Sequence, residues 1–117
     1  MAITQEPDLR FEVEEGEDAS GTKRVRIRCR GRLVYENAPR IKELVKPLIA
    51  RGGQVAIDLA EVNYLDSAGL GALVGLKVTA VNQGDCRLEL ENQSPWIREM
   101  LRLTHLTEFF ASEGRAS

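Results

Sequence analysis

The chain has 117 residues and a mass of 13.0 kDa, which is room for one compact domain. Hydrophobic residues make up 43% and charged residues 29%, a globular balance that argues against disordered, collagenous and membrane-embedded classes. Sixteen Lys and Arg against eighteen Asp and Glu leave a formal charge of -2, so we expect no nucleic-acid binding through a broad positive surface.

Two strands are predicted first, after a flexible lead-in at residues 1–8. Residues 9–14 alternate apolar and charged side chains at the two-residue period of a half-buried strand. After a polar turn at residues 16–21, residues 24–30 alternate again, with four arginines on one face and apolar side chains on the other. The pattern predicts a β-hairpin. The arginine row is a candidate phosphate-binding surface, but glutamates of the first strand can pair with it, and we favour this cross-paired, solvated face.

A helix and a buried strand are predicted next. Asn37 is a candidate N-cap, and Pro39 lies in the first turn, where its missing N–H costs little. Apolar residues recur at three- and four-residue spacing until Gly52 and Gly53 end the helix. The short apolar run at residues 54–59 is typical of a buried central strand in a parallel arrangement.

The second half of the chain continues the alternation of helices and strands. A helix is predicted from Asp66 and Ser67 to about Val81, then a strand at residues 86–91 and a third helix capped by Ser94. The predicted packing stripe of the second helix is Leu70, Leu73, Val74 and Val78. The apolar residues assigned to the third helix are Ile97, Met100, Leu101 and Leu103, and Leu106, Phe109 and Phe110 close the core.

These elements predict an α/β fold: a single domain at residues 9–111, with a mixed four- to five-stranded sheet and about three helices packed on it. Residues 112–117 are expected to form a flexible tail. The longest nearly uncharged stretch, residues 64–80, is too short and too polar for a membrane span of about 20 apolar residues. Residues 1–8 lack the basic start and apolar block of a secretory signal, so we expect a cytoplasmic protein without membrane association.

Few side chains point to metal or catalytic chemistry. Cys29 and Cys86 lie far apart without a second pair, so we expect two buried thiols rather than a zinc site or a disulfide framework. His105, the single histidine, lies in a segment typical of a helix-end turn. We therefore expect no metal and no cofactor.

The segment at residues 64–71, Tyr-Leu-Asp-Ser-Ala-Gly-Leu-Gly, departs from ordinary packing patterns. It connects a buried strand to a helix, and such junctions lie at the carboxyl edge of the sheet, where open α/β sheets bind ligands and partners. Its glycines do not follow the spacing G-x-G-x-x-G of dinucleotide sites, since Val74 stands where the third glycine belongs. Leu65 replaces the first glycine of the hydrolase motif G-x-S-x-G, so we expect no enzymatic activity.

Small residues cluster at the start of the second helix. Asp66 or Ser67 serves as its N-cap. Residues with a higher helix propensity would make this end of the helix more stable, so capping alone does not explain the cluster. Small side chains at an exposed helix end let the backbone of another protein approach closely. A helix N-terminus also accommodates an added phosphate, because its free N–H groups and dipole favour anions.

The sequence resembles the STAS domain, the sulphate transporter and anti-sigma factor antagonist family, and in particular its small bacterial anti-sigma factor antagonists. The resemblance spans nearly the whole chain. It is carried by Val55-Ala56-Ile57-Asp58-Leu59, Val62, the run from Leu65 to Leu73, Gly84, and Ser94-Pro95. The Asp-Ser-x-Gly-Leu-Gly run after such a strand is its most specific part.

The resemblance implies a partner-switching protein. In the antagonists, the serine after the aspartate, by position Ser67, is phosphorylated by an anti-sigma factor that is a GHKL-type serine kinase. The unphosphorylated antagonist binds this kinase and releases the sigma factor, and a phosphoserine phosphatase resets the switch. The predicted partner-binding residues are Asp66, Ser67, Ala68, Gly69, Leu70 and Gly71. Asp66 is expected to orient the junction, while Gly69 and Gly71 leave space for the partner.

Four points stay open at this stage. Val34 stands where many antagonists carry an acidic residue, in a G-x-L-D stretch after the second strand. The alternative function is that of a STAS subunit in another bacterial assembly, a lipid-transport or sensory complex, in which Ser67 is not phosphorylated. Trp96, just after Pro95, is either an exposed partner contact or a side chain that packs on the core. The sequence predicts no particular oligomeric state.

Overall fold

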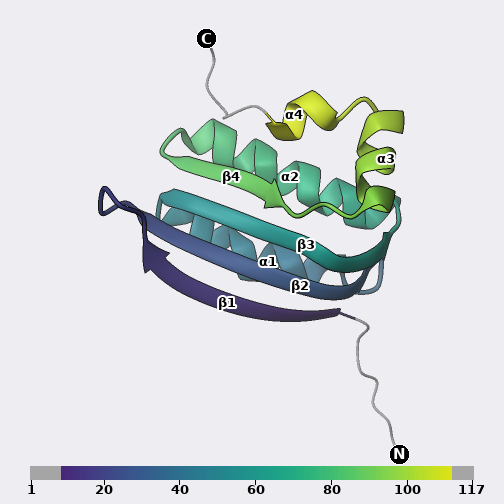
Figure 1. Cartoon of the computed structure of the whole chain (residues 1–117), viewed down its shortest axis with the longest axis horizontal. Coiled ribbons are helices and arrows are strands. Elements are labelled where there is room, and N and C mark those ends of the chain that lie inside the picture. Colours follow the sequence, from purple (N-terminus) through teal and green to yellow (C-terminus); the bar gives the residue numbers. More distant parts are fainter. Residues whose placement is uncertain (1–8, 112–117) are drawn as a thin grey trace, which may run out of the picture.

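A computed structural model describes residues 9–111 of the chain (Figure 1). The predicted lead-in at residues 1–8 and the predicted tail at residues 112–117 lie outside the described residues. In chain order the elements are β1 (Leu9–Glu17), β2 (Lys23–Leu33), α1 (Ala38–Ala50), β3 (Gly53–Leu65), α2 (Ser67–Gln83), β4 (Cys86–Glu91), α3 (Pro95–Leu103) and α4 (Thr107–Ala111).

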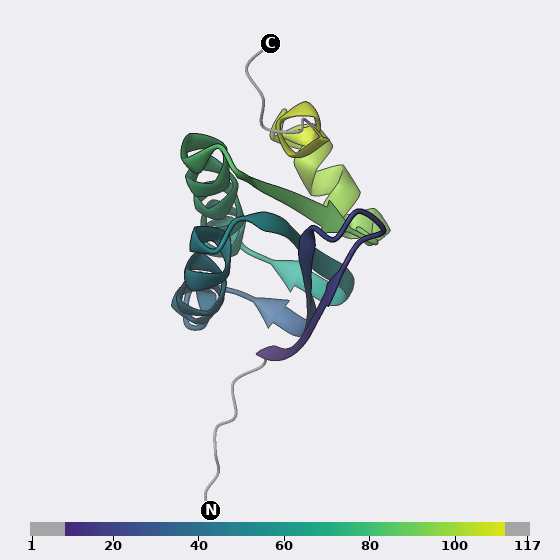
Figure 2. The same ribbon diagram turned by 90° about the vertical axis from the view of Figure 1, so that its left-hand side faces the viewer.

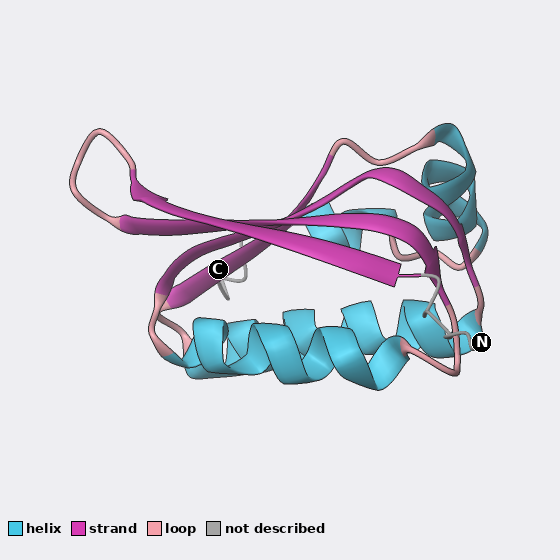
Figure 3. Cartoon of the chain, turned by 90° about the horizontal axis from the view of Figure 1, so that it is seen from below, coloured by secondary structure: helices cyan, strands magenta, loops and turns pink. Residues whose placement is uncertain are grey.

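The strands form one mixed sheet in the order β1-β2-β3-β4. The hairpin partners β1 and β2 are antiparallel, whereas β2, β3 and β4 run parallel. Helices α1 and α2 lie side by side on one face of the sheet (Figure 2), and α3 lies on the opposite side, near the end of β3 (Figure 3). The predicted mixed α/β sheet is confirmed, with four strands and a parallel central β3.

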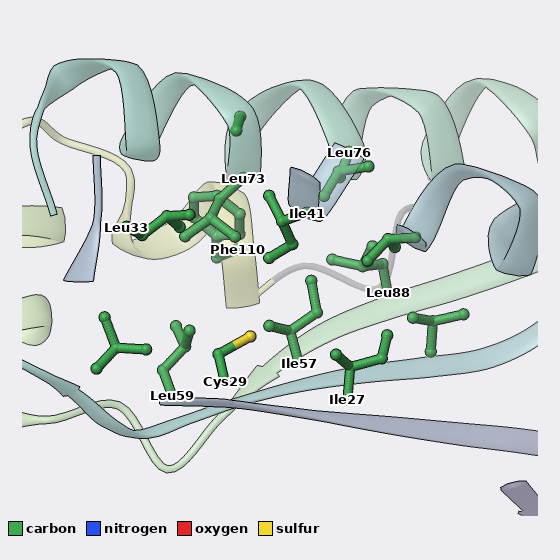
Figure 4. Close-up of a cluster of buried hydrophobic side chains, with 14 of the residues drawn as sticks. Ile27, Cys29, Leu33, Ile41, Ile57, Leu59, Leu73, Leu76, Leu88 and Phe110 are labelled. Carbon is green, nitrogen blue, oxygen red and sulfur yellow. The ribbon is translucent and has the colours of Figure 1, made fainter. Parts of the chain in front are cut away.

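The core fills the space between the sheet and the helices α1 and α2 (Figure 4). Val25, Ile27 and Cys29 of β2 point into it, as their alternation predicts. Cys29 and Cys86 are both buried free thiols, as expected. Burial, together with the nearby Asp58 carboxylate, raises the pKa of the Cys29 thiol to about 12, so at neutral pH this group is a packing element rather than a nucleophile.

The arginines of β2 occupy the other face of the sheet, and carboxylates surround them. Arg28 lies 3.6 Å from Glu14 of the neighbouring β1. Arg24 and Arg26 instead reach Glu91 of β4, at 2.9 and 3.1 Å. The cross-paired face is therefore confirmed, although only part of the pairing runs across the hairpin.

Strand β3 extends beyond the predicted residues 54–59 and ends at Leu65. Its register against β2 shifts between Arg28, which faces Asp58, and Arg30, which faces Glu61. This irregularity inserts an extra residue and breaks the apolar alternation, which is why the pattern alone ended the strand too early. The extension carries the chain to the carboxyl edge of the sheet.

Helix α2 turns a different face to the core than the sequence predicted. Leu73 is buried as expected, but Val78 is 41% exposed, so its place on the packing stripe was wrong. The buried positions include Leu76 and Lys77. The Lys77 ammonium group donates to the Leu88 carbonyl at 2.9 Å, so the buried cation has a partner.

The C-terminal helices complete the core around β4. Ile97 and Leu101 of α3 and Phe110 of α4 are buried, whereas Leu103 is exposed and lies outside the core, contrary to its assignment. His105 follows α3 with a positive φ of 62°, which confirms the predicted helix-end turn. Within residues 9–111, no helix combines the length and the apolar character needed to cross a membrane.

Candidate functional site

The junction between β3 and α2 lies at the carboxyl edge of the sheet (Figure 1). Leu65 ends the strand and Ser67 begins the helix, so Asp66 alone makes the connection. Its backbone is extended, and its N–H donates to the Leu33 carbonyl at the end of β2, at 3.2 Å. The ends of the two parallel strands are thereby joined at this point.

Asp66, rather than Ser67, caps helix α2. One carboxylate oxygen accepts the Gly69 N–H at 2.8 Å, and the other accepts the Tyr35 N–H at 3.0 Å. The Gly69 N–H is the main cause that holds the pKa of Asp66 below its ordinary value, with the Tyr35 N–H contributing and partial desolvation opposing. Asp66 is therefore ionised at neutral pH and ties α2 to the loop between β2 and α1.

Ser67 is the first residue of α2, and its side chain is exposed. Among residues 9–111, no hydrogen-bond partner for its hydroxyl is found, because capping is performed by Asp66. An anion attached to this hydroxyl would lie at the positive end of the 17-residue helix. The position thus combines accessibility, a free hydroxyl and a favourable field for negative charge.

The two glycines of the junction have different surroundings. Gly69 is buried, and a Cβ built on it would lie 2.2 Å from the Leu33 carbonyl oxygen. Its small size is required by the chain's own packing of α2 against the end of β2, so the prediction that it leaves space for a partner is wrong. Gly71 is exposed, with nothing within 4 Å of such a Cβ, and remains the glycine at which a partner has room.

The predicted partner-binding set is brought together by the first turns of α2, but not all of it is accessible. Ser67 and Gly71 are exposed and Gly69 is buried. The half-buried members are Asp66, Ala68 and Leu70. Ser67 and Gly71 are therefore the members of this set that are most open to solvent.

Asn37 positions the site, a role that the sequence did not indicate. It occupies the N-cap position of α1, as predicted, yet its side chain makes no capping hydrogen bond. Its amide oxygen accepts the Val34 N–H at 2.8 Å, and its amide nitrogen donates to the Arg32 carbonyl at 2.9 Å. These bonds shape the loop that presents the Tyr35 N–H to Asp66.

Aromatic side chains lie on the opposite side of the same edge. The ring of Trp96, in the first turn of α3, packs on the ring of Tyr64, near the end of β3, with centroids 5.2 Å apart. The Arg32 guanidinium also lies over the Tyr64 ring, at 5.2 Å. Trp96 is 38% exposed, so it packs on a surface ring rather than within the core.

The part of the chain that the structure describes holds no group of three or more His, Cys, Asp or Glu side chains suited to a metal ion. The edge combines a free serine hydroxyl, a capping carboxylate and exposed aromatic rings.

Known proteins resemble this chain in sequence and in fold. The STAS domain model matches residues 11–116. The anti-sigma-B factor antagonist of Bacillus subtilis is 32% identical over 84 residues, which cover 72% of this chain and 76% of the relative.

Two solved proteins have a similar fold. An anti-sigma factor antagonist from Mycobacterium paratuberculosis aligns with a TM-score of 0.70 and 22% identity, covering 92% of this chain and 87% of that one. The antagonist SpoIIAA in its unphosphorylated form aligns with a TM-score of 0.66 and 21% identity, covering 85% and 84%.

The chain belongs to the STAS domain family, as its sequence indicated, and its curated relatives are named as anti-sigma factor antagonists. These relatives, the anti-sigma factor antagonists, are non-enzymatic regulatory proteins.

Proposed function

We propose that this protein is an anti-sigma factor antagonist switched by phosphorylation of Ser67. Unphosphorylated, it binds an anti-sigma factor that is also a GHKL-type serine kinase, and the sigma factor is released. Phosphorylation of Ser67 by that kinase ends the complex, and a phosphoserine phosphatase restores the binding form. The cycle takes place in the cytoplasm and involves no direct contact with nucleic acid.

The observation that carries the proposal is the state of Ser67. Its hydroxyl is exposed and is not needed for capping, because the Asp66 carboxylate already accepts the Gly69 N–H. A kinase therefore meets an available nucleophile at a rigid position. Asp66, held on both oxygens by backbone N–H groups, keeps the junction in one conformation for the kinase.

The relatives support the same scheme. The curated relatives are named for antagonism of the anti-sigma-B factor, and SpoIIAA has been solved in phosphorylated and unphosphorylated forms. We infer from the resemblance of the Asp-Ser-x-Gly-Leu-Gly run that Ser67 corresponds to the serine that is phosphorylated in that branch of the family.

The effect of phosphate follows from its charge. A phosphoserine carries about -1.5 to -2 charges, at a site that already holds the Asp66 carboxylate. The added charge gains about 0.3–1 kcal/mol from the helix dipole, which helps the free protein tolerate it. In the complex, by contrast, the dianion loses water without a partner of opposite charge, which is far more costly. Phosphorylation thus weakens binding without unfolding the domain.

One observation favours a second candidate, a STAS subunit of a lipid-transport or sensory assembly. Val34 occupies the position at which many antagonists carry an acidic residue, and here it is buried in the loop beside the site. The contact that this acid provides is therefore absent from the chain. In this alternative, Ser67 is a protein contact that no kinase modifies.

Titration of Ser67 variants against purified GHKL-type serine kinases of the same organism tests the proposal. We expect Ser67→Ala to bind like the wild type and Ser67→Asp to bind at least ~10-fold more weakly, a loss of about 1.4 kcal/mol. Ser20→Asp, which adds the same charge in the exposed turn between β1 and β2, is the matched control and should bind normally. Equal affinities for all variants would remove the electrostatic switch, and binding only to transporter or sensor subunits would favour the second candidate.

A further inference from the structure

The ring contact between Tyr64 and Trp96 forms a surface that packing within the chain leaves partly open. Tyr64 is 39% exposed and Trp96 is 38% exposed, although they contact each other. Together with the Arg32 guanidinium over the Tyr64 ring they form what we call the aromatic platform (Arg32, Tyr64 and Trp96). Tyr and Trp are enriched at protein interfaces, where the apolar ring is buried and the polar group can still find a hydrogen-bond partner.

Attachment of α3 to the sheet does not account for this surface. The helix is held by Ile97 and Leu101, whose side chains are fully buried. Its N-terminus is fixed separately, since the Ser94 hydroxyl accepts the Ile97 N–H at 3.3 Å and Pro95 begins the helix. The buried side chains and the helix cap therefore hold this end of α3 in addition to the contact between Trp96 and Tyr64.

The platform and the switch residue lie at the same carboxyl edge of the sheet, on opposite faces of it (Figure 3). Arg32 pairs with Tyr64 in the register of β2 and β3, one position before both strands end. Ser67 follows Tyr64 by three residues, so their Cα atoms lie at most about 11 Å apart. A stable protein interface covers about 800 Å² per partner, on the order of 30 Å across. An interface of this width is therefore large enough to include both Ser67 and the platform if the partner covers the edge of the sheet between them.

We propose that the aromatic platform is a second contact for the same partner protein that binds at Ser67, an inference that rests on the function proposed above. Trp, Tyr and Arg are the residue types that contribute most binding energy in protein interfaces, and rings already held in place lose little conformational entropy on binding. The platform takes an apolar side chain of the anti-sigma factor. It supplies affinity that is independent of the charge at Ser67, while Ser67 supplies the switch.

Three variants test this inference against the kinase that binds the wild-type chain. Trp96→Ala should weaken binding at least ~10-fold, whereas Trp96→Phe, which keeps a ring on Tyr64, should lose less than about 3-fold. The matched control is Leu103→Ala, which truncates an exposed apolar side chain at the other end of α3 and should bind like the wild type. Thermal denaturation of each variant establishes that it is folded.

Hydroxyl-radical footprinting of the wild-type complex gives a second measurement that needs no substitution. Trp96 is the single tryptophan of the chain, and its oxidation should fall at least about 5-fold when the kinase is bound. Unchanged oxidation, or equal affinity of folded Trp96→Ala and wild type, overturns the platform while leaving the Ser67 switch intact. A kinase that does not bind the wild-type chain overturns both proposals.

Discussion

Gly69 and Gly71, two residues apart in α2, should respond in opposite directions to the same substitution. In Gly69→Ala, the new Cβ lies 2.2 Å from the Leu33 carbonyl oxygen and 2.9 Å from its carbonyl carbon. Ordinary contacts begin near 3.5 Å, so α2 has to move by about 1 Å from the end of β2. Both groups are backbone atoms, which cannot rotate away as a side chain can.

The expected size of the effect follows from two opposing contributions. The overlap should lower the free energy of unfolding of Gly69→Ala by about 3 kcal/mol, the upper end of the range typical of overpacking. The higher helix propensity of alanine opposes this loss by about 1 kcal/mol. The net loss is about 2 kcal/mol, or a Tm lower by at least about 8 °C for a domain of this size. In Gly71→Ala the new Cβ has no atom within 4 Å. This variant should therefore gain about 1 kcal/mol in free energy of unfolding from the helix propensity of alanine.

Thermal and urea denaturation, followed by circular dichroism, measure both variants against the wild type. A rise in Tm for Gly71→Ala beside a fall for Gly69→Ala is the expected result. If both variants shift in the same direction, or if Gly69→Ala is neutral, the close approach of α2 to β2 at this point is wrong.

Three further substitutions or modifications have defined outcomes. Asn37→Ala removes one buried and one part-buried hydrogen bond and leaves the Val34 N–H without its acceptor, so we expect a loss of about 2 kcal/mol in urea denaturation. An unchanged midpoint would mean that the loop does not depend on Asn37. Because the folded pKa of Asp66 is lowered from 3.8, its stabilisation is present above about pH 4 and is lost as the pH falls through the folded value. Asp66→Ala should therefore lower Tm by a few degrees at pH 7 and by less below pH 4. A difference in Tm that grows in acid would contradict the lowered pKa of Asp66. Phosphorylation of Ser67 should leave Tm within a few degrees and change amide chemical shifts mainly from Asp66 to Gly71; widespread changes in β4 would instead indicate a remodelled core.

Much of the fold follows from local patterns in the sequence. The alternation of Val25, Ile27 and Cys29 placed β2 correctly on the core, because strand burial has a strict two-residue period. The start of α2 at Ser67 was equally predictable, since capping chemistry acts within one turn. Gly52, with a φ of 79°, ends α1 as expected.

What the sequence did not predict depends on contacts between distant segments. Helix α2 is apolar on nearly every face, so no periodicity distinguished buried Leu76 from exposed Val78. The burial of Lys77 requires the Leu88 carbonyl of β4 as acceptor. The role of Gly69 is set by the Leu33 carbonyl, 36 positions earlier in the chain, and no local signal reveals it.

The central claim, that Ser67 is the switch, is tested most directly by locating the phosphate after incubation with a GHKL-type serine kinase and ATP. Three other hydroxyls are engaged: Ser20 bonds to Asp18, the Ser94 oxygen accepts a backbone N–H as a helix cap, and Thr79 donates to a carbonyl of its own helix. Peptide mass spectrometry should find the phosphate on Ser67 and none on Ser67→Ala. Phosphate chiefly on Ser20, Thr79 or Ser94, or undiminished incorporation into Ser67→Ala, would contradict the account.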